Sequence, residues 1–507
     1  MPGATPSSWV PRTRPADRAS LRAWAPPLAL VALAAALRPP GLDYGLPFPL
    51  LNPDERSLVP RAWSMGNGGG LDPGWYDYPS LLLALLAPLQ APFDVPSYGA
   101  ARAIAAAVGI AGVAAAWWLG RVAYGRAAGV VAGGACAVAT VHVAYSHMAV
   151  TDVLLTTLVT IALALAVTGR LEWAGAAVGL AASAKYPGVL LALPVVVVGW
   201  REWRRLAVAA ALAVVAFALT SPFVLLNAAA AWTDLRRVQR LAADGWLGFE
   251  HDLPTPLAFL DRLWESLGPF LVVALAGLGL ALAELVLKHH KLRRPAASPP
   301  RASGAAGRDG LVLNQHNLAR ARADLALVVF GLVWFAQLLT IEAHFDRYVL
   351  PLVPVLGALA GRVRPLVPLS LALLVVPLAW SVGEVRQLTR TDTRLVAHAW
   401  IGENVPPGVS FATESSTPPV DPRPTLALRL PGPGFATDPN RDVGRLRARG
   451  VEYVLVSGAV ADRVLAAAGH YPAEARFYRQ LEREAERVLH VVPGEGLAGP
   501  WVALYRL

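Results

Sequence analysis

The sequence predicts a polytopic α-helical membrane protein that ends in a small soluble domain, and three observations carry this prediction. Of its 507 residues, 55% are hydrophobic and only 16% are charged. The mean hydropathy of +0.45 is far above what a soluble chain of this length needs. Long apolar runs recur up to residue 381, and beyond that point the chain becomes polar and mixed.

The apolar runs predict about eleven membrane crossings, because each run is long enough, or nearly so, to span roughly 30 Å of hydrocarbon. They lie at 23–38, 99–120, 127–147, 153–169, 172–186, 188–200, 206–226, 266–287, 325–341, 347–361 and 365–381. The run at 79–92 is shorter and is bracketed by prolines. We therefore expect this run to lie along the membrane surface as a juxtamembrane helix.

Basic residues set the expected orientation in a plasma membrane. Residues 1–22 are rich in arginine and are not followed by a small-residue cleavage site, so they predict a cytoplasmic N-terminus before an uncleaved helix. With eleven crossings the positively charged connectors share that side, including a cytoplasmic loop at 288–322 with eight Lys or Arg against Asp309. The first outer loop at 39–98 and the outer loop at 227–263 then lie on the extracytoplasmic side.

The transmembrane domain is expected to span 23–381, and residues 382–507 are expected to form an extracytoplasmic mixed α/β domain. Its pattern predicts helices at 393–404 and 473–488, a Pro-rich loop at 418–439, and strands at 409–413, 451–457 and 501–505. About 110 residues are enough for a separate core.

Charge and cysteine content exclude two other interpretations. The formal charge is +10, but the basic residues lie between apolar runs and not on one soluble face, so we expect membrane lipids and not nucleic acid as partners. Cys136 is the only cysteine in the sequence, which excludes a disulfide within the chain.

Adjacent carboxylates at Asp54 and Glu55 lie in the first outer loop, just past the first apolar run, at the expected edge of the bilayer. Paired acids at that depth suggest contact with a proton, a cation or a reacting hydroxyl. The alternative is that they only cap a juxtamembrane helix. The predicted orientation brings further polar groups to the same face: Asp77, Asp152, His251 and the segment 344–348.

Seven short motifs in order resemble the polyprenyl-phosphate-dependent glycosyltransferases of the GT-C fold, the group of protein O-mannosyltransferases and aminoarabinose transferases (glycosyltransferase family 39 type). They are Asn52-Pro-Asp-Glu, Asp77-Tyr-Pro-Ser, Ala101-Arg-Ala-Ile, Tyr145-Ser-His-Met-Ala-Val-Thr-Asp, Ser183-Ala-Lys-Tyr-Pro-Gly, Gly248-Phe-Glu-His-Asp-Leu-Pro and Asp346-Arg-Tyr-Val-Leu-Pro. The resemblance implies a GT-C membrane domain that transfers a sugar from a polyprenyl-phosphate donor to a protein, lipid or polysaccharide acceptor of the cell envelope.

The resemblance also implies roles for individual residues. Asp54 is expected to accept the proton of the acceptor hydroxyl, with Glu55 and Asp152 as further catalytic acids. The donor phosphate is expected to contact Lys185, Arg347, Tyr348 and Arg102. No cofactor is certain, but a divalent cation between Asp77 and His251 is conceivable.

Simpler roles remain open for several of these residues. Asp152 could be a first-turn acid stabilised by its helix dipole, Lys185 could extend to the membrane interface, and His251 could be an ordinary surface histidine. Where aminoarabinose transferases have a lysine beside the first-loop acid, this chain has Tyr78, which argues against the same donor sugar. Two rival functions are a secondary transporter or flippase, which would need matching interrupted helices, and an inactive scaffold.

Overall fold

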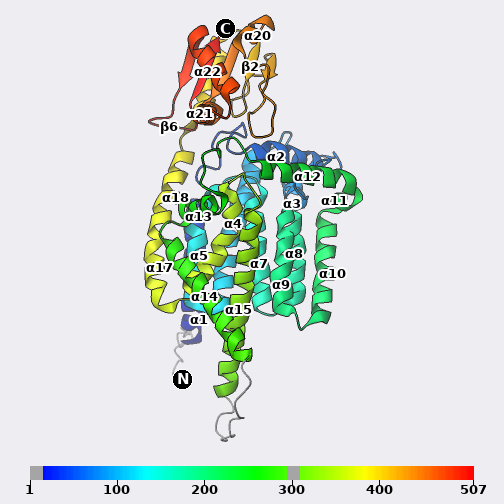
Figure 1. Ribbon diagram of the computed structural model, residues 1–507, viewed down its shortest axis with the longest axis vertical. Coiled ribbons are helices and arrows are strands. Elements are labelled where there is room, and N and C mark those ends of the chain that lie inside the picture. The colour runs from blue at the N-terminus through cyan, green and yellow to red at the C-terminus, as the bar shows by residue number, and fades with distance from the viewer. Residues whose placement is uncertain (1–14, 294–308) are drawn as a thin grey trace, which may run out of the picture.

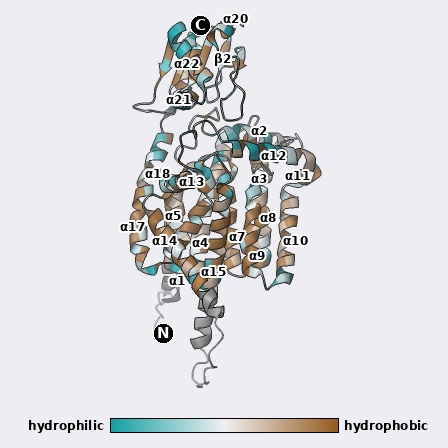
Figure 2. Ribbon diagram, in the orientation of Figure 1, coloured by the Kyte–Doolittle hydropathy of each residue, from teal (hydrophilic) through white to brown (hydrophobic). Residues whose placement is uncertain are grey.

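The computed structural model describes residues 15–293 and 309–507, and it consists of a helical bundle with an α/β domain at one end (Figure 1). Helix α1 (Pro15–Leu37) begins at the opposite end of the bundle, where α14 (Phe270–Arg293) ends and α15 (Asp309–Leu338) begins. Figure 2 shows hydrophobic residues concentrated along the bundle and hydrophilic residues at its ends and in the C-terminal domain. Residues 1–14 of the predicted N-terminal segment and residues 294–308 of the predicted cytoplasmic loop lie outside the described residues.

Within the described residues, five helical stretches are long and apolar enough to cross a membrane. They are Tyr98–Tyr124, Trp203–Thr220, Phe270–Leu287, Ala319–Leu338 and Arg364–Leu388. Shorter apolar helices accompany them at Trp24–Leu37, Leu81–Gln90, Arg126–Val138, Thr151–Val167, Tyr186–Gly199 and Leu352–Gly361. The protein is thus a multi-pass membrane protein, while the number of about eleven crossings stays a prediction.

Besides α1, α14 and α15, the bundle and its outer surface contain further helical elements. In chain order they are α2 (Pro53–Gly66), α3 (Leu81–Gln90), α4 (Tyr98–Tyr124), α5 (Arg126–Val138), α6 (Thr140–Tyr145), α7 (Thr151–Val167), α8 (Leu171–Ala184), η1 (Tyr186–Leu191), α9 (Ala192–Gly199), α10 (Trp203–Thr220), α11 (Pro222–Leu226), α12 (Ala228–Asp244), α13 (Thr255–Leu267), η2 (Asp346–Val349), α16 (Leu352–Gly361), η3 (Arg364–Leu366), α17 (Val367–Leu373) and α18 (Val375–Leu388).

Helix α3 does not cross the bundle. Its 10 residues extend only about 15 Å, half of the hydrocarbon thickness. The chain also returns to α2 after it, because the Trp63 indole donates to the carbonyl of Phe93 at 2.7 Å and the Asn67 amide to that of Gln90 at 3.4 Å. The juxtamembrane position of residues 79–92 stays a prediction.

Helices α8 and α10 pack closely through small residues. A methyl group on Gly175 would lie 2.1 Å from the carbonyl oxygen of Ala209, and one on Gly179 would lie 2.1 Å from that of Ala213. Of the residues of α10, only Ala209 is buried. Close backbone approach holds this helix to the bundle while its other faces remain available to lipid.

Exposed tryptophans mark one membrane interface. Trp173, Trp200 and Trp203 are each about two-thirds exposed and lie at the ends of α8, α9 and α10 that face away from the C-terminal domain. The Arg201 and Arg204 guanidinium groups lie 4.8 and 5.3 Å from the Trp200 and Trp203 rings. Tryptophan and arginine together are typical of the headgroup region on the basic side of a membrane protein.

The C-terminal domain contains a five-stranded sheet with the order β3-β2-β4-β7-β5. Strands β2 (Phe411–Thr413), β3 (Thr425–Ala427) and β4 (Tyr453–Ser457) are parallel, and β7 (Val502–Arg506) runs antiparallel to β4 and to β5 (Glu486–Val491). Its helices are α19 (Thr393–Asn404), α20 (Val443–Ala448), α21 (Gly458–Ala466) and α22 (Pro472–Glu484). A short parallel pair, β1 (Thr391–Asp392) and β6 (Leu497–Ala498), joins the domain to α18.

The prediction for this domain was wrong at two places. The helix expected at 473–488 ends at Glu484, and the residues after it form β5, because they pair with β7 along a sheet edge. The Pro-rich loop at 418–439 contains β3, a strand of three residues that is too short to give a periodic signal.

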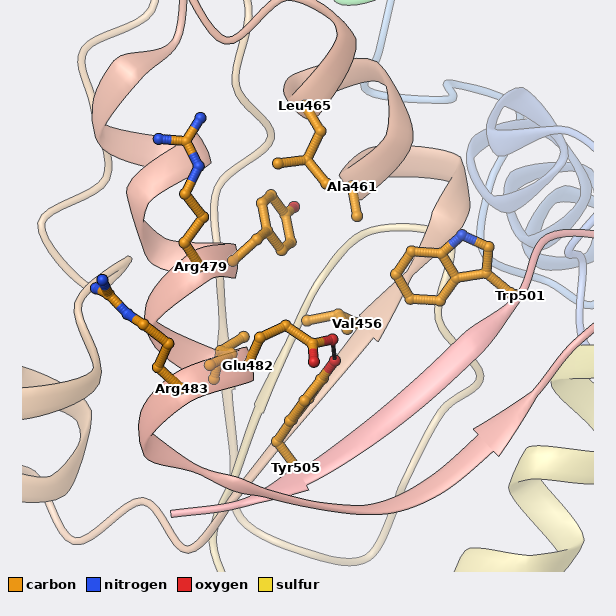
Figure 3. A pocket seen from close by; sticks show the side chains of 10 residues that line it. Val456, Ala461, Leu465, Arg479, Glu482, Arg483, Trp501 and Tyr505 are labelled. Atoms are coloured by element: carbon orange, nitrogen blue, oxygen red, sulfur yellow. Dashed lines mark hydrogen bonds between the residues drawn. The ribbon is translucent and has the colours of Figure 1, made fainter.

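A hollow of about 400 Å³ lies in this domain between α21, α22 and the sheet (Figure 3). Trp501 forms one wall, Leu465 and Ala461 lie above, and the Tyr505 hydroxyl donates to Glu482 at its lower edge. None of the site residues expected from the sequence lines this hollow.

The C-terminal domain contacts both predicted outer loops. The Arg394 guanidinium donates to the carbonyl of Leu50 at 2.8 Å in the first outer loop. In the second, Glu250 accepts a short hydrogen bond from the Tyr471 hydroxyl, and His251 Nε2 lies 3.2 Å from the carbonyl oxygen of Ala466. The two loops and the C-terminal domain therefore share one end of the molecule.

Candidate functional site

Asp54 is presented by the first turn of α2. Asn52 is the N-cap, and its side-chain oxygen accepts a hydrogen bond of 2.9 Å from the Asp54 backbone N–H. Pro53 occupies the first helical position, where its fixed φ angle and missing N–H cost nothing. The Asn-Pro-Asp-Glu sequence thus builds a helix start that fixes the direction of the Asp54 side chain.

Two groups from distant parts of the chain bind the Asp54 carboxylate. Arg347, in η2, donates from Nη1 to Asp54 Oδ2 at 2.6 Å, and the Tyr78 hydroxyl donates to the same oxygen at 3.0 Å. The Asp54 side chain is 24% exposed and that of Arg347 14%. The carboxylate is thus held by a cation and a hydroxyl while part of it remains accessible.

A second ion pair lies beside the first. Lys185, at the C-cap of α8, donates from Nζ to Oδ1 of Asp152 at 2.6 Å, and Asp152 lies in the first turn of α7. The two side chains are only 12% and 4% exposed, so Lys185 does not extend into the interface. Among the described residues no group hydrogen-bonds the buried Oδ2 of Asp152 or the buried Nε of Arg347. These two atoms could therefore bind a ligand.

Two tyrosine rings connect the ion pairs. The Lys185 ammonium lies 5.5 Å from the centroid of the Tyr78 ring and 5.3 Å from that of Tyr348. The Arg347 guanidinium lies 5.7 Å from the Tyr348 ring. Both cations therefore interact with aromatic faces as well as with carboxylates. We call these six residues the charged cluster: Asp54, Tyr78, Asp152, Lys185, Arg347 and Tyr348.

The environment sets the ionisation of the groups in the outer loops. Burial by itself would raise the pKa of Asp54, but Arg347, with help from Lys185 and the Tyr78 hydroxyl, outweighs it and lowers this pKa below the usual value. Burial raises the pKa of Tyr78 well above its usual value. Asp54 is therefore a carboxylate at neutral pH and Tyr78 a neutral hydroxyl.

Glu55 and Arg102 do not join this cluster, and the geometry does not support their expected roles in catalysis and phosphate binding. Arg102 donates to the two Glu55 oxygens at 2.8 and 2.7 Å and to the carbonyls of Leu42 and Tyr44, and both side chains are fully buried. Glu55 also accepts from the Ala149 N–H at 2.9 Å. With its donors satisfied inside the protein, Arg102 ties the first outer loop to α4 and cannot reach a lipid phosphate without breaking this pair.

The expected metal pair is not assembled either. Asp77 forms a short ion pair with Arg237 of α12, whereas His251 contacts the C-terminal domain. Throughout residues 15–293 and 309–507, no group of three or more His, Cys, Asp or Glu side chains is placed to hold a metal ion. The two residues have separate partners, so they do not form a ready site for a divalent cation.

Supporting contacts that the sequence did not indicate surround the cluster. The Tyr145 hydroxyl donates to Asp346 Oδ1 at 2.7 Å, and the same oxygen accepts the Arg347 backbone N–H at 2.8 Å. These bonds fix η2, which carries Arg347 and Tyr348. Tyr145 and Asp346 are the first residues of two of the seven motifs. This place in the motifs was the signal in the sequence that could have identified them as supporting residues.

Two comparisons with known proteins concern sequence. The model of glycosyltransferase family 87 matches residues 75–304, a stretch that includes Tyr78, Asp152 and Lys185. No curated protein matches the chain. The match is to family 87, so the family 39 type expected from the sequence is not confirmed.

Comparison with solved structures identifies the fold. The chain resembles ArnT from Cupriavidus metallidurans bound to undecaprenyl phosphate, with 16% identity, a TM-score of 0.54 and coverage of 96% of this chain and 98% of that chain. Apo ArnT from the same organism gives 15% identity and a TM-score of 0.55 over the same shares. The Archaeoglobus fulgidus oligosaccharyltransferase in complex with Zn and sulfate gives 14% identity and a TM-score of 0.52 over 94% and 72%. The chain therefore has the GT-C membrane fold.

Proposed function

We propose that the protein is a membrane glycosyltransferase that moves a sugar from a polyprenyl-phosphate carrier to an acceptor hydroxyl of the cell envelope. The charged cluster is the observation that carries this proposal. It places two carboxylates and two cations at the end of the bundle that faces the C-terminal domain, and five separate segments supply its residues. The glycosyltransferase family model favours this function over the transporter or flippase.

The reaction would be a single displacement at the anomeric carbon. The acceptor oxygen forms a bond to that carbon as the bond to the phosphate oxygen breaks, so the configuration is inverted. Asp54 takes the proton of the acceptor hydroxyl, because it is ionised and part of its carboxylate is accessible. The polyprenyl phosphate leaves with the bonding electrons.

Arg347 and Lys185 would bind the departing phosphate. Each cation is paired with a carboxylate in the free protein. A phosphate can compete for both because it offers several charged oxygens, and the guanidinium can bind two of them at once. The unpartnered Nε of Arg347 is one donor already available for this contact.

The proposed orientation follows from the charges at the two ends of the bundle. The connector between α9 and α10 carries Arg201, and the first turn of α10 carries Arg204; both lie at the end away from the C-terminal domain, beside Trp200 and Trp203. By the positive-inside rule this end is cytoplasmic. The charged cluster and the C-terminal domain would then be extracytoplasmic, where polyprenyl-linked sugars meet envelope acceptors.

Asp54→Asn tests the proposal. Purified protein is mixed with lipid-linked sugars and acceptor fractions extracted from membranes that lack the gene product, and new glycans are measured by mass spectrometry. We expect the variant to lose transfer by about 10²- to 10⁴-fold, the usual contribution of a general base. Asp94→Asn, at an exposed acid of the same outer loop, should keep full transfer. Full transfer by Asp54→Asn at normal protein levels would refute the assignment, and solute uptake into proteoliposomes without transfer would favour a transporter.

A further inference from the structure

Tyr78 contacts both ion pairs of the charged cluster. Its hydroxyl donates to Asp54 Oδ2 at 3.0 Å, and the face of its ring lies 5.5 Å from the Lys185 ammonium. It belongs to the connection that precedes α3. Two residues further on, the Ser80 N–H donates to Ser221 Oγ at 2.8 Å, which fixes this connection to the outer end of α10. Tyr78 is therefore held in place independently of the two groups that it contacts.

The two contacts have different chemical effects. A hydroxyl that donates to a carboxylate stabilises its ionised form and fixes its direction. An aromatic face attracts an ammonium without competing with a phosphate for its N–H groups. The hydroxyl therefore acts on Asp54, the proposed base, and the ring on Lys185, the proposed phosphate ligand.

We infer that Tyr78 is a positioning residue that keeps the proposed base aligned while the cations turn from their carboxylates to the donor phosphate. This inference rests on the proposed function. When Arg347 turns to the phosphate, Asp54 loses its shortest hydrogen bond, and the Tyr78 hydroxyl is the neutral partner that stays. Because it does not carry charge, it is not drawn away by the phosphate.

The other charged and titratable groups around Asp54 cannot replace this contact. Lys185 is bound to Asp152 on α7, and Arg347 would leave with the phosphate. The Tyr348 ring contacts the Lys185 and Arg347 cations. Glu55, which follows Asp54 in α2, forms an ion pair with Arg102. Tyr78 is therefore the hydroxyl that can orient Asp54 during the transfer step.

Two substitutions separate the two contacts. Tyr78→Phe keeps the ring and removes the hydroxyl, so the acid limb of the pH profile of transfer should move up by about one pH unit and kcat should fall about tenfold. Binding of undecaprenyl phosphate, the carrier without sugar, should stay within about twofold. Tyr78→Gln keeps a hydrogen-bond donor and removes the ring, so undecaprenyl phosphate should bind about tenfold more weakly and the acid limb should stay in place.

Tyr76→Phe is the matched control, because the Tyr76 hydroxyl donates to Asp72, away from the charged cluster, at 2.7 Å. It should change neither the pH profile nor carrier binding. The inference is overturned if Tyr78→Phe leaves the acid limb and kcat unchanged, or if both Tyr78 variants lose transfer and carrier binding equally, as a purely structural residue would. A wild-type protein that neither transfers sugar nor binds undecaprenyl phosphate would instead refute the proposed function.

Discussion

Replacing Glu55 by Gln should destabilise the protein, although its neighbour Asp54 is the proposed base. The Glu55 carboxylate accepts two hydrogen bonds from Arg102 and one from the Ala149 N–H, and both charged side chains are fully buried. An amide offers one acceptor and one donor in the same space, so it leaves the buried Arg102 cation without a counter-charge.

The magnitude follows from that burial. Breaking a buried ion pair by removing one partner costs about 3–5 kcal/mol, whereas surface pairs contribute about 0–1 kcal/mol. Glu265→Gln is the control, because its carboxylate is 54% exposed and pairs with Arg262 three residues away. We expect the control to change the unfolding free energy by less than about 0.5 kcal/mol.

The assay is thermal unfolding of the purified protein in detergent. The folded fraction that remains after heating is measured by size-exclusion chromatography with fluorescence detection. Glu55→Gln should lower the midpoint by several degrees, and the double variant Glu55→Gln with Arg102→Gln should recover part of the loss, because it also removes the orphaned charge. If Glu55→Gln unfolded at the wild-type temperature and lost transfer instead, the pair would not be structural and the sequence-based catalytic role of Glu55 would be restored.

Three further changes test the charged cluster. Arg347→Gln removes the cation that lowers the pKa of Asp54, so this pKa should rise from below the ordinary aspartate value of about 3.9. The acid limb of the pH profile of transfer should therefore move to higher pH, which a pH titration of transfer would detect. An unchanged limb would show that Arg347 does not control the base. Lys185→Met leaves the Asp152 carboxylate unpaired and should weaken binding of undecaprenyl phosphate at least tenfold, a change of about 1.4 kcal/mol; equal binding would remove Lys185 from the phosphate site. His251→Ala should keep transfer within about twofold, because its ring contacts the Ala466 carbonyl and the His470 ring of the C-terminal domain and none of the charged cluster, and twofold changes are within the range of surface substitutions. A loss of transfer that added metal restored would support the metal pair.

Much of the architecture could be predicted from composition and periodicity. Apolar runs identify membrane helices because lipid requires about 20 apolar residues for each crossing. The distribution of arginine and lysine predicts that Asp54, Asp152 and the segment 344–348 share one side of the membrane, and in the structure Asp54 contacts Arg347 of that segment. Helix 393–404 was predicted with the bounds of α19, since the Asp392 side chain caps it.

Short and edge elements could not be predicted in the same way. Strand β5 continues directly from a charged helix, and its state depends on pairing with β7, which follows it in the chain. Strand β3 has three residues, so it gives no usable period. The roles of Asp77 and His251 depended on whether two loops meet, and loop contacts carry no local signal.

By itself, the sequence determined that this is a membrane protein with its reactive groups gathered at one end, because hydrophobicity and charge act residue by residue along the chain. Only the tertiary structure decided which groups meet. Asp54 and Glu55 are neighbours, but successive side chains point about 100° apart around a helix. Asp54 consequently reaches Arg347, which is 293 residues away, while Glu55 turns inward to Arg102. Partner choice of this kind depends on the packing of helices, which no local pattern encodes.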